Sequence, residues 1–304
     1  MMPIPNSEIE ISVPWGKISG KTWGDKSCSP ILVLHGIQDN CGSFDRLIPL
    51  LPRAFYYVCI DLPGHGMSSH FPPGLPLEFI NYVYSVKLVV DHLKWTKFKM
   101  IGHSLGAQIT VFFSSLYPNF VEKAVLIDGI TPIIIDVERT PSHLRSIYNN
   151  LQTLEKNILN KKPPSYTYEE ALKRLISSRK TEISKESAEC LIKRALAPSN
   201  DGYMFSSDQR LKLFLRPCLT MQQMKSIINC MVCKTLMIIA QDTYDLIDEV
   251  SEELYHERLK EFFSKNPHLK MYLVKGNHDV HMNFPQRVVP YVTAFLLEPN
   301  KSSL

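Results

Sequence analysis

The strongest indication of the fold is the sequence KMIGHSLGAQITVFFSSL, residues 99–116. A short apolar run ends at Ile101, the pattern G-x-S-x-G follows from Gly102 to Gly106, and apolar residues at helical spacing continue to Leu116. A strand, a tight turn that carries a serine and a helix are the context that a nucleophile elbow requires. The two glycines leave room where a side chain would collide with the neighbouring strand or helix. Ser104 is therefore the candidate nucleophile.

Short apolar runs that end in loops recur on both sides of this stretch. Six are predicted to be strands: Ile31–Leu34, Tyr56–Ile60, Lys99–Ile101, Ala124–Ile127, Thr235–Ala240 and Met271–Val274. Three stretches between them are predicted to be helices: Ser43–Leu51, Glu78–Leu93 and Leu105–Leu116. Near-continuous apolar strands that alternate with helices favour a mostly parallel, doubly wound α/β sheet. Ile9–Val13 and Lys17–Thr22 are predicted to form an antiparallel hairpin ahead of it.

The alternation of strands and helices stops after Pro132. From there to Cys233 only Ile133–Ile135 is predicted to be a strand, and the clearest helices are Glu169–Ser178 and Lys185–Leu196. So long a segment is not a loop of a compact domain. We therefore expect residues 1–131 and 234–304 to form the α/β core, and residues 132–233 to be an inserted helical cap, or lid.

Composition excludes several classes of protein. The 304 residues include 34 Lys and Arg against 30 Asp and Glu, a net charge of +4 that no stretch concentrates, which disfavours nucleic-acid binding. No apolar run is long enough to cross a membrane, and residues 1–10 lack the features of a secretory signal. Seven scattered cysteines suit a reducing compartment, with mostly free, buried thiols. We expect a cytoplasmic protein without stable membrane insertion.

A serine hydroxyl needs a base that takes its proton, and on this type of elbow the acid and the histidine follow the serine in the chain. His278 lies just after the last predicted strand, on a loop that returns over the carboxyl edge of the sheet. It is preferred to His281, which we interpret as a packing or loop-fixing residue. Asp128 and Asp242 each follow a predicted strand at the same edge, and both remain candidates for the acid that orients the imidazole.

The tetrahedral intermediate of acyl transfer needs backbone N–H donors. One should be Leu105, the residue after the nucleophile, and the other should come from the loop His35–Asn40 after the first parallel strand. Ile37 is the natural donor there, since Gly36 lets the backbone approach closely. The predicted site thus combines the elbow residues Gly102, His103 and Gly106, the catalytic candidates Ser104, His278, Asp128 and Asp242, and the oxyanion donors Ile37 and Leu105.

At these residues the sequence resembles the α/β-hydrolase family, and within it the serine hydrolase-like branch that includes Kraken. The resembling stretches run over nearly the whole chain: Val13–Gly16, His35–Asn40, Ser43–Pro52, Gly64–His70, Gly102–Gly106, Asp208–Leu211 and Gly276–Met282. The resemblance implies a hydrolase core with a helical cap, activity through Ser104 and His278, and no cofactor. The family often has Trp where Ile37 stands and an acidic residue near Asn283, and the residues around Asp242 fit its usual acid position poorly. Asp128 therefore stays a candidate.

We expect a serine hydrolase that cleaves an ester or related acyl bond of a small, largely apolar substrate, with neither metal nor cofactor. An acyl thioesterase is the nearest alternative, and a catalytically silent binding protein with the hydrolase fold is the alternative from another class. The C-terminal Ser302–Leu304 is a weak variant of the peroxisomal S-K-L address.

Overall fold

The computed structural model describes residues 6–132, 137–160, 162–250, 264 and 269–299. Eight of the described strands form one sheet in the order β1-β2-β4-β3-β5-β6-β9-β10. Their bounds are β1 (Asn6–Val13), β2 (Gly16–Trp23), β3 (Ser29–Leu34), β4 (Phe55–Ile60), β5 (Phe98–His103), β6 (Val121–Ile127), β9 (Lys234–Ala240) and β10 (Lys270–Val274). The strands from β4 to β10 in that order pair in parallel, and the β1–β2 hairpin joins β4 antiparallel. The predicted α/β class and N-terminal hairpin are confirmed.

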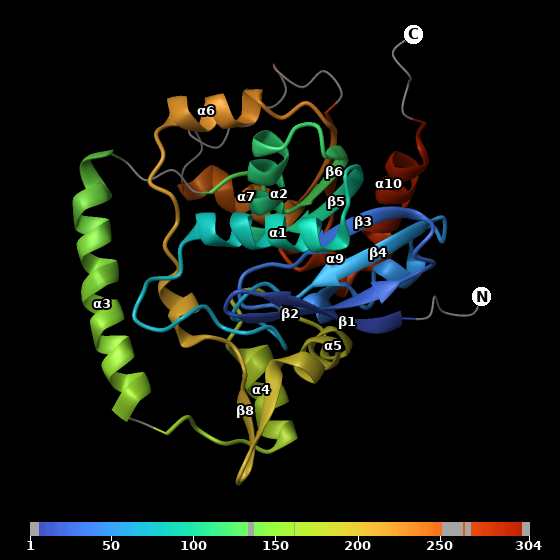
Figure 1. The fold of residues 1–304 in the computed structure, drawn as a ribbon. Coiled ribbons are helices and arrows are strands. Elements are labelled where there is room, and N and C mark those ends of the chain that lie inside the picture. Colours follow the sequence, from blue (N-terminus) through green and yellow to red (C-terminus); the bar gives the residue numbers. More distant parts are fainter. Residues whose placement is uncertain (1–5, 133–136, 161, 251–263, 265–268, 300–304) are drawn as a thin grey trace.

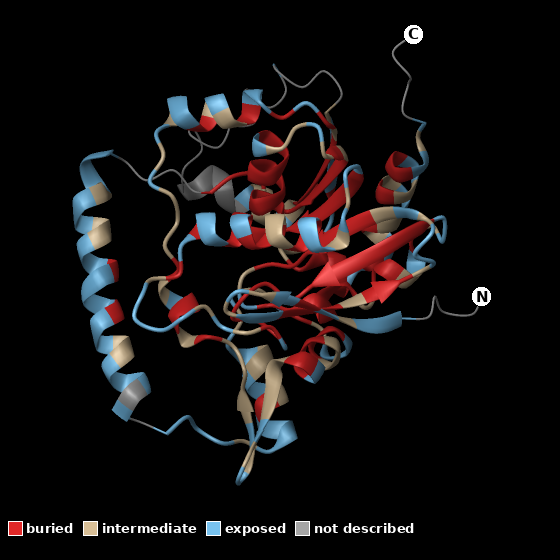
Figure 2. Cartoon of the chain, viewed as in Figure 1, coloured by how far each residue is buried: buried red, intermediate tan, exposed pale blue. Residues whose placement is uncertain are grey.

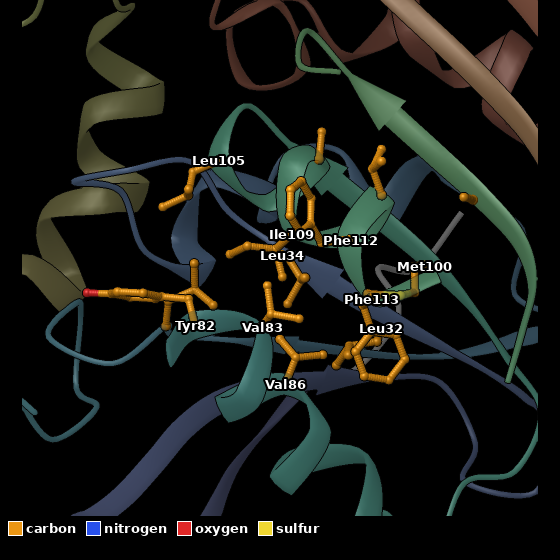
Figure 3. Packing of buried hydrophobic residues seen from close by; sticks show 14 of the residues in the cluster. Leu32, Leu34, Tyr82, Val83, Val86, Met100, Leu105, Ile109, Phe112 and Phe113 are labelled. Atoms are coloured by element: carbon orange, nitrogen blue, oxygen red, sulfur yellow. The ribbon is translucent and has the colours of Figure 1, made fainter. Parts of the chain in front are cut away.

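The parallel strands bury side chains on both faces of the sheet. Leu32 and Leu34 of β3 belong to one hydrophobic cluster, and Ile31 and Val33 belong to the cluster on the other face. The first face packs against α1 (Phe79–Leu93) and α2 (Leu105–Leu116), as Figure 3 shows for Leu34, Val83 and Ile109 among others. The second face packs against α9 (Val280–Asn283) and α10 (Pro285–Leu297). The central strands are accordingly buried along their length (Figure 2).

The observed helices agree with two of the three predicted ahead of residue 132. The predicted α2 is confirmed at both ends, and α1 begins one residue later than predicted because Glu78 has extended backbone angles. The helix predicted at Ser43–Leu51 is wrong. Two short 3₁₀ turns, η1 (Cys41–Phe44) and η2 (Ile48–Leu50), occupy the segment instead. Pro49 has no N–H to donate, so the hydrogen bond that a continuous helix would need at this residue is missing.

Between β6 and β9 the described chain is mostly helical, as predicted. Its elements are η3 (Val137–Arg139), α3 (Thr140–Asn160), α4 (Tyr168–Ser177), α5 (Lys185–Ala195), β7 (Leu196–Ser199), β8 (Gly202–Phe205), η4 (Gln209–Leu213) and α6 (Met221–Asn229). The β7–β8 hairpin was not predicted, and Ile133–Ile135 lie outside the described residues. Figure 1 shows α3 standing beside the body of the molecule, while α6 packs against α2. The division into core and cap stays a prediction.

Buried ion pairing ties α5 to the sheet. Arg194 donates from Nε and Nη2 to Asp61 Oδ2 at 3.0 and 2.8 Å, and both side chains are almost fully buried. Asn40, in the loop after β3, donates from Nδ2 to the carbonyl oxygen of Leu191 in the same helix. The segment containing α5 is therefore fixed against the loops at the carboxyl edge of the sheet.

The remaining sequence expectations concern thiols and membranes. All seven cysteines are free, and three of them, Cys41, Cys59 and Cys233, are buried. No helix among the described residues is long and apolar enough to cross a bilayer. The C-terminal tripeptide lies outside the described residues.

Candidate active site

Ser104 occupies a strained turn between β5 and α2. Its backbone angles are φ 50° and ψ −113°, a conformation that residues with a side chain rarely adopt. A Cβ atom on Gly106 would lie 2.2 Å from the carbonyl oxygen of Leu34, and one on Gly102 would lie 2.4 Å from the carbonyl carbon of Gly106. The strand–turn–helix context of the elbow is confirmed, and the two glycines are required by the close approach of neighbouring backbone.

His278 lies in the loop between β10 and α9, where its Nδ1 is 2.6 Å from Oδ2 of Asp128. Asp128 follows β6 and has a left-handed backbone, with φ 46°. Its Oδ1 accepts from the backbone N–H of Ala240 at 2.8 Å, and its Oδ2 also accepts from the Thr243 hydroxyl at 2.6 Å. Three donors from three segments thus fix the carboxylate, and Nδ1 of His278 is the protonated ring nitrogen that faces it.

The surroundings of His278 favour its charged form. Burial alone would lower the pKa of His278, but the hydrogen bond and charge of Asp128 outweigh burial and raise the pKa above its ordinary value of 6.5. The carboxylates of Asp279 and Asp39 act in the same direction. The His278 side chain is 33% exposed and Ser104 is half-buried, so neither residue is sealed from solvent.

The structure separates the two aspartates that the sequence left open. Asp242 is the second residue of α7 (Gln241–Val250), is exposed, and uses its backbone N–H to donate to the carbonyl oxygen of Gly276. Among the described residues, the carboxylate hydrogen-bonded to His278 belongs to Asp128. His281 is buried in α9, with its ring stacked 4.0 Å from the ring of His103 between centroids. It therefore has a packing position, as expected.

The loop after β3 is held by a second buried histidine. His35 Nε2 accepts from the Leu62 N–H at 2.9 Å, so its Nδ1 carries the proton and donates to the carbonyl oxygen of Gly36 at 2.7 Å. Burial lowers the pKa of His35, which keeps the ring neutral. Within the described part of the chain, the N–H groups of Ile37 and Leu105 donate to no protein acceptor. Their role as oxyanion donors stays a prediction.

Two further residues complete the geometry, and neither was assigned these contacts from sequence. Thr243 binds the Asp128 carboxylate from the start of α7, a position that only the folded sheet brings near β6. His103, the variable residue of the elbow, donates from Nε2 to the carbonyl oxygen of His278 at 2.9 Å. Burial and the neighbouring His278 lower the pKa of His103 to about 4, so this ring is neutral and its donor is fixed.

Metal-ligating side chains do not converge in the described structure. In the ranges from residue 6 to 299 that are described, no three His, Cys, Asp or Glu side chains are placed to hold a metal ion. Cys230 is exposed and Cys233 is buried, and both are free thiols.

Comparison with known proteins supports the same fold. A family model for the alpha/beta hydrolase fold matches residues 29–285. A serine hydrolase-like protein of Danio rerio is 34% identical over 294 residues, covering 95% of this chain and 88% of that protein. Serine hydrolase-like protein 2 of Homo sapiens is 34% identical over 307 residues, covering 95% and 94%. The solved structure of a hypothetical protein from Pseudomonas aeruginosa, 27% identical, superposes with a TM-score of 0.81 over 95% of this chain and 99% of that one.

The family match spans the parallel strands, the elbow and the loop of His278, and the two relatives span nearly the whole chain. The chain therefore belongs to the α/β-hydrolase fold family, among the serine hydrolase-like proteins.

Proposed function

We propose that this protein is a serine hydrolase that cleaves an ester or related acyl bond of a small, largely apolar molecule. Ser104 is the nucleophile, His278 the base and Asp128 the acid of the triad. The observation that carries the proposal is the 2.6 Å hydrogen bond between His278 Nδ1 and Asp128 Oδ2, at the sheet edge to which the elbow brings Ser104. An imidazole whose Nδ1–H donates a hydrogen bond to a carboxylate keeps Nε2 free to accept a proton from a serine.

The reaction follows from these roles. Nε2 of His278 takes the hydroxyl proton while Ser104 Oγ attacks the substrate carbonyl carbon, and the resulting oxyanion accepts hydrogen bonds from the N–H groups of Ile37 and Leu105. His278 then gives the proton to the leaving group, and the acyl group stays on Ser104 as an ester. A water molecule, deprotonated by His278, then attacks the acyl carbon, and His278 returns the proton to Ser104 Oγ as the acid leaves. Asp128 stabilises the imidazolium in both halves of the reaction without being protonated.

Hydrolysis of a panel of substrates tests the proposal. We expect p-nitrophenyl esters to be turned over by the natural protein and not by Ser104→Ala, with folding of the variant checked by circular dichroism. Cleavage of acyl-CoA thioesters without cleavage of the esters would make the protein a thioesterase instead. If neither class is turned over, the proposed activity is wrong, and tight binding of an uncleaved ester would identify a silent binding protein.

A further inference from the structure

Arg179, in the segment between α4 and α5, bridges two loops of the proposed machinery. Its Nη1 donates to Asp39 Oδ1 at 2.7 Å and its Nη2 donates to Asp279 Oδ1 at 2.8 Å. Asp39 lies two residues after Ile37, and Asp279 directly follows His278. The Arg179 side chain is 16% exposed, and the two carboxylates are 2% and 0% exposed, so water is nearly excluded from the bridge.

Neighbouring residues fasten the same segment to the His278 loop. Thr181 donates its hydroxyl to Asp279 Oδ2 at 2.6 Å. The carbonyl oxygen of Glu182 accepts from the side-chain amides of Asn277 and Asn283, at 2.7 and 2.9 Å. Contacts on both sides of His278 in sequence therefore come from the predicted cap, and Arg179 is the one among them that also reaches the loop of Ile37.

A further contact reaches the loop of His278 from the elbow. His103 donates to the carbonyl oxygen of His278, while its unprotonated Nδ1, 3.9 Å from Asp39 Oδ2, makes no hydrogen bond to that carboxylate. The hydrogen-bonded chain thus runs from Asp39 through Arg179 to Asp279, which adjoins His278, and His103 also binds the His278 backbone. Each of these contacts holds either backbone or a buried charge, so a displacement of Arg179 would be transmitted to the loops of both Ile37 and His278.

Stability alone does not account for such a bridge. A buried ion network is often no more stabilising than apolar residues of the same volume, because the charges lose their hydration. What a guanidinium adds is geometry, since its planar fork holds two carboxylates at fixed positions. Here that fork sets the spacing between the loop that carries Ile37 and the loop that carries His278.

We propose that Arg179 is a positioning residue, which holds the loops of Ile37 and His278 in register only while the segment between α4 and α5 is docked on the sheet edge. The inference rests on the proposed serine hydrolase function. It makes turnover depend on the docking of the predicted cap, although Arg179 itself touches none of the reacting atoms.

Arg179→Met is the direct test, because it keeps an unbranched apolar stem and removes the fork. We expect kcat on a p-nitrophenyl ester to fall about 10–100-fold, the usual effect of a misplacement near 1 Å, with KM changed by less than about threefold. The matched control is Arg174→Met, an exposed arginine of α4 that stacks over Tyr166 and takes no part in the bridge. It should keep the natural kcat.

A second readout does not depend on activity. The charged and titratable groups that face His278 are Asp128 after β6, Asp279 in its own loop, Asp39 after β3, His103 in the elbow, His281 in α9 and Arg179. Removing the cation leaves the negative charges of Asp39 and Asp279 less compensated. The His278 pKa measured by NMR titration should therefore rise in Arg179→Met. A loss of stability alone would not move this pKa.

The results separate the two proposals. If the natural protein hydrolyses no ester, the proposed function fails, and the NMR titration still tests the bridge. Natural kcat together with an unmoved His278 pKa in Arg179→Met would overturn the role of Arg179, even if the variant melts at a lower temperature. Should Arg179→Met not fold, Arg179→Lys replaces it. This variant keeps the charge without the fork, and we expect a several-fold loss of kcat, whereas natural kcat would overturn the proposal.

Discussion

Replacing Asp128 by Asn should block the basic nitrogen of His278 without disturbing the fold. The Ala240 N–H points at Oδ1, so the Asn oxygen must take that position and the Asn Nδ2 must take the position of Oδ2. There Nδ2 donates to Nδ1 of His278, which forces the ring proton onto Nε2, where it blocks the transfer from Ser104. The Thr243 hydroxyl can rotate to accept from the new amide. Asn also tolerates the left-handed φ of 46° at this position.

The expected loss of kcat follows from the wrong tautomer of the His278 ring. Such a change lowers kcat by about 10⁴-fold, or about 5.4 kcal/mol of transition-state stabilisation. The free energy of unfolding should fall by only about 1–3 kcal/mol, because one hydrogen bond loses its charge while the carboxamide stays paired.

Steady-state hydrolysis of a p-nitrophenyl ester measures the loss of kcat, and urea denaturation measures the change in the free energy of unfolding. Asp242→Asn is the matched control, since Asp242 is exposed at the start of α7, and it should keep kcat within about twofold. An Asp128→Asn variant that keeps more than about a tenth of kcat refutes the tautomer argument. If Asp242→Asn is the inactive variant, the acid has been assigned to the wrong strand.

Three other predictions follow from the same geometry. His278 must be uncharged to act as a base, and its pKa is raised, so kcat/KM should fall with decreasing pH with a midpoint above 6.5; a midpoint well below 6.5 contradicts the role of Asp128. Gly106→Ala forces a methyl group against backbone and should lower the free energy of unfolding by about 3 kcal/mol or more, whereas a loss below about 1 kcal/mol in urea denaturation would be inconsistent with the close approach. Arg194→Met leaves Asp61 buried without its cation and should cost about 3–5 kcal/mol by the same measurement; a neutral effect would show that water hydrates the site.

The elbow could be predicted because its signals are local. The apolar run of β5, the two glycines around Ser104 and the helical spacing of α2 follow one another within twenty residues, and both bounds of α2 are confirmed. The short hairpin β7–β8 carries no such signal. Its strands LAPS and GYMF contain a proline and no β-branched residue, so only pairing in the folded chain reveals them.

The acid could not be chosen from sequence because β6 and β9 are neighbours in a parallel sheet, and Asp128 and Asp242 follow their carboxyl ends. Tertiary structure separates them. The left-handed backbone of Asp128 leaves its carboxylate among three donors, while helix α7 begins at Gln241 and leaves Asp242 exposed.

The contacts of Arg179 could likewise not be predicted from the sequence. It is 140 residues from Asp39 and 100 from Asp279 along the chain, and an isolated arginine in a polar segment ordinarily indicates solvent exposure. The bridge exists only because the segment between α4 and α5 folds back over two loops that the sheet has already brought together.

Mass spectrometry of the protein after reaction with a fluorophosphonate tests the central claim most directly, because this reagent is captured by a serine that a neighbouring base has activated. We expect one adduct per chain, located on the tryptic peptide that contains Ser104, with no adduct in Ser104→Ala and greatly slowed labelling in His278→Ala. An adduct on another residue, or labelling of Ser104→Ala at the natural rate, would contradict it.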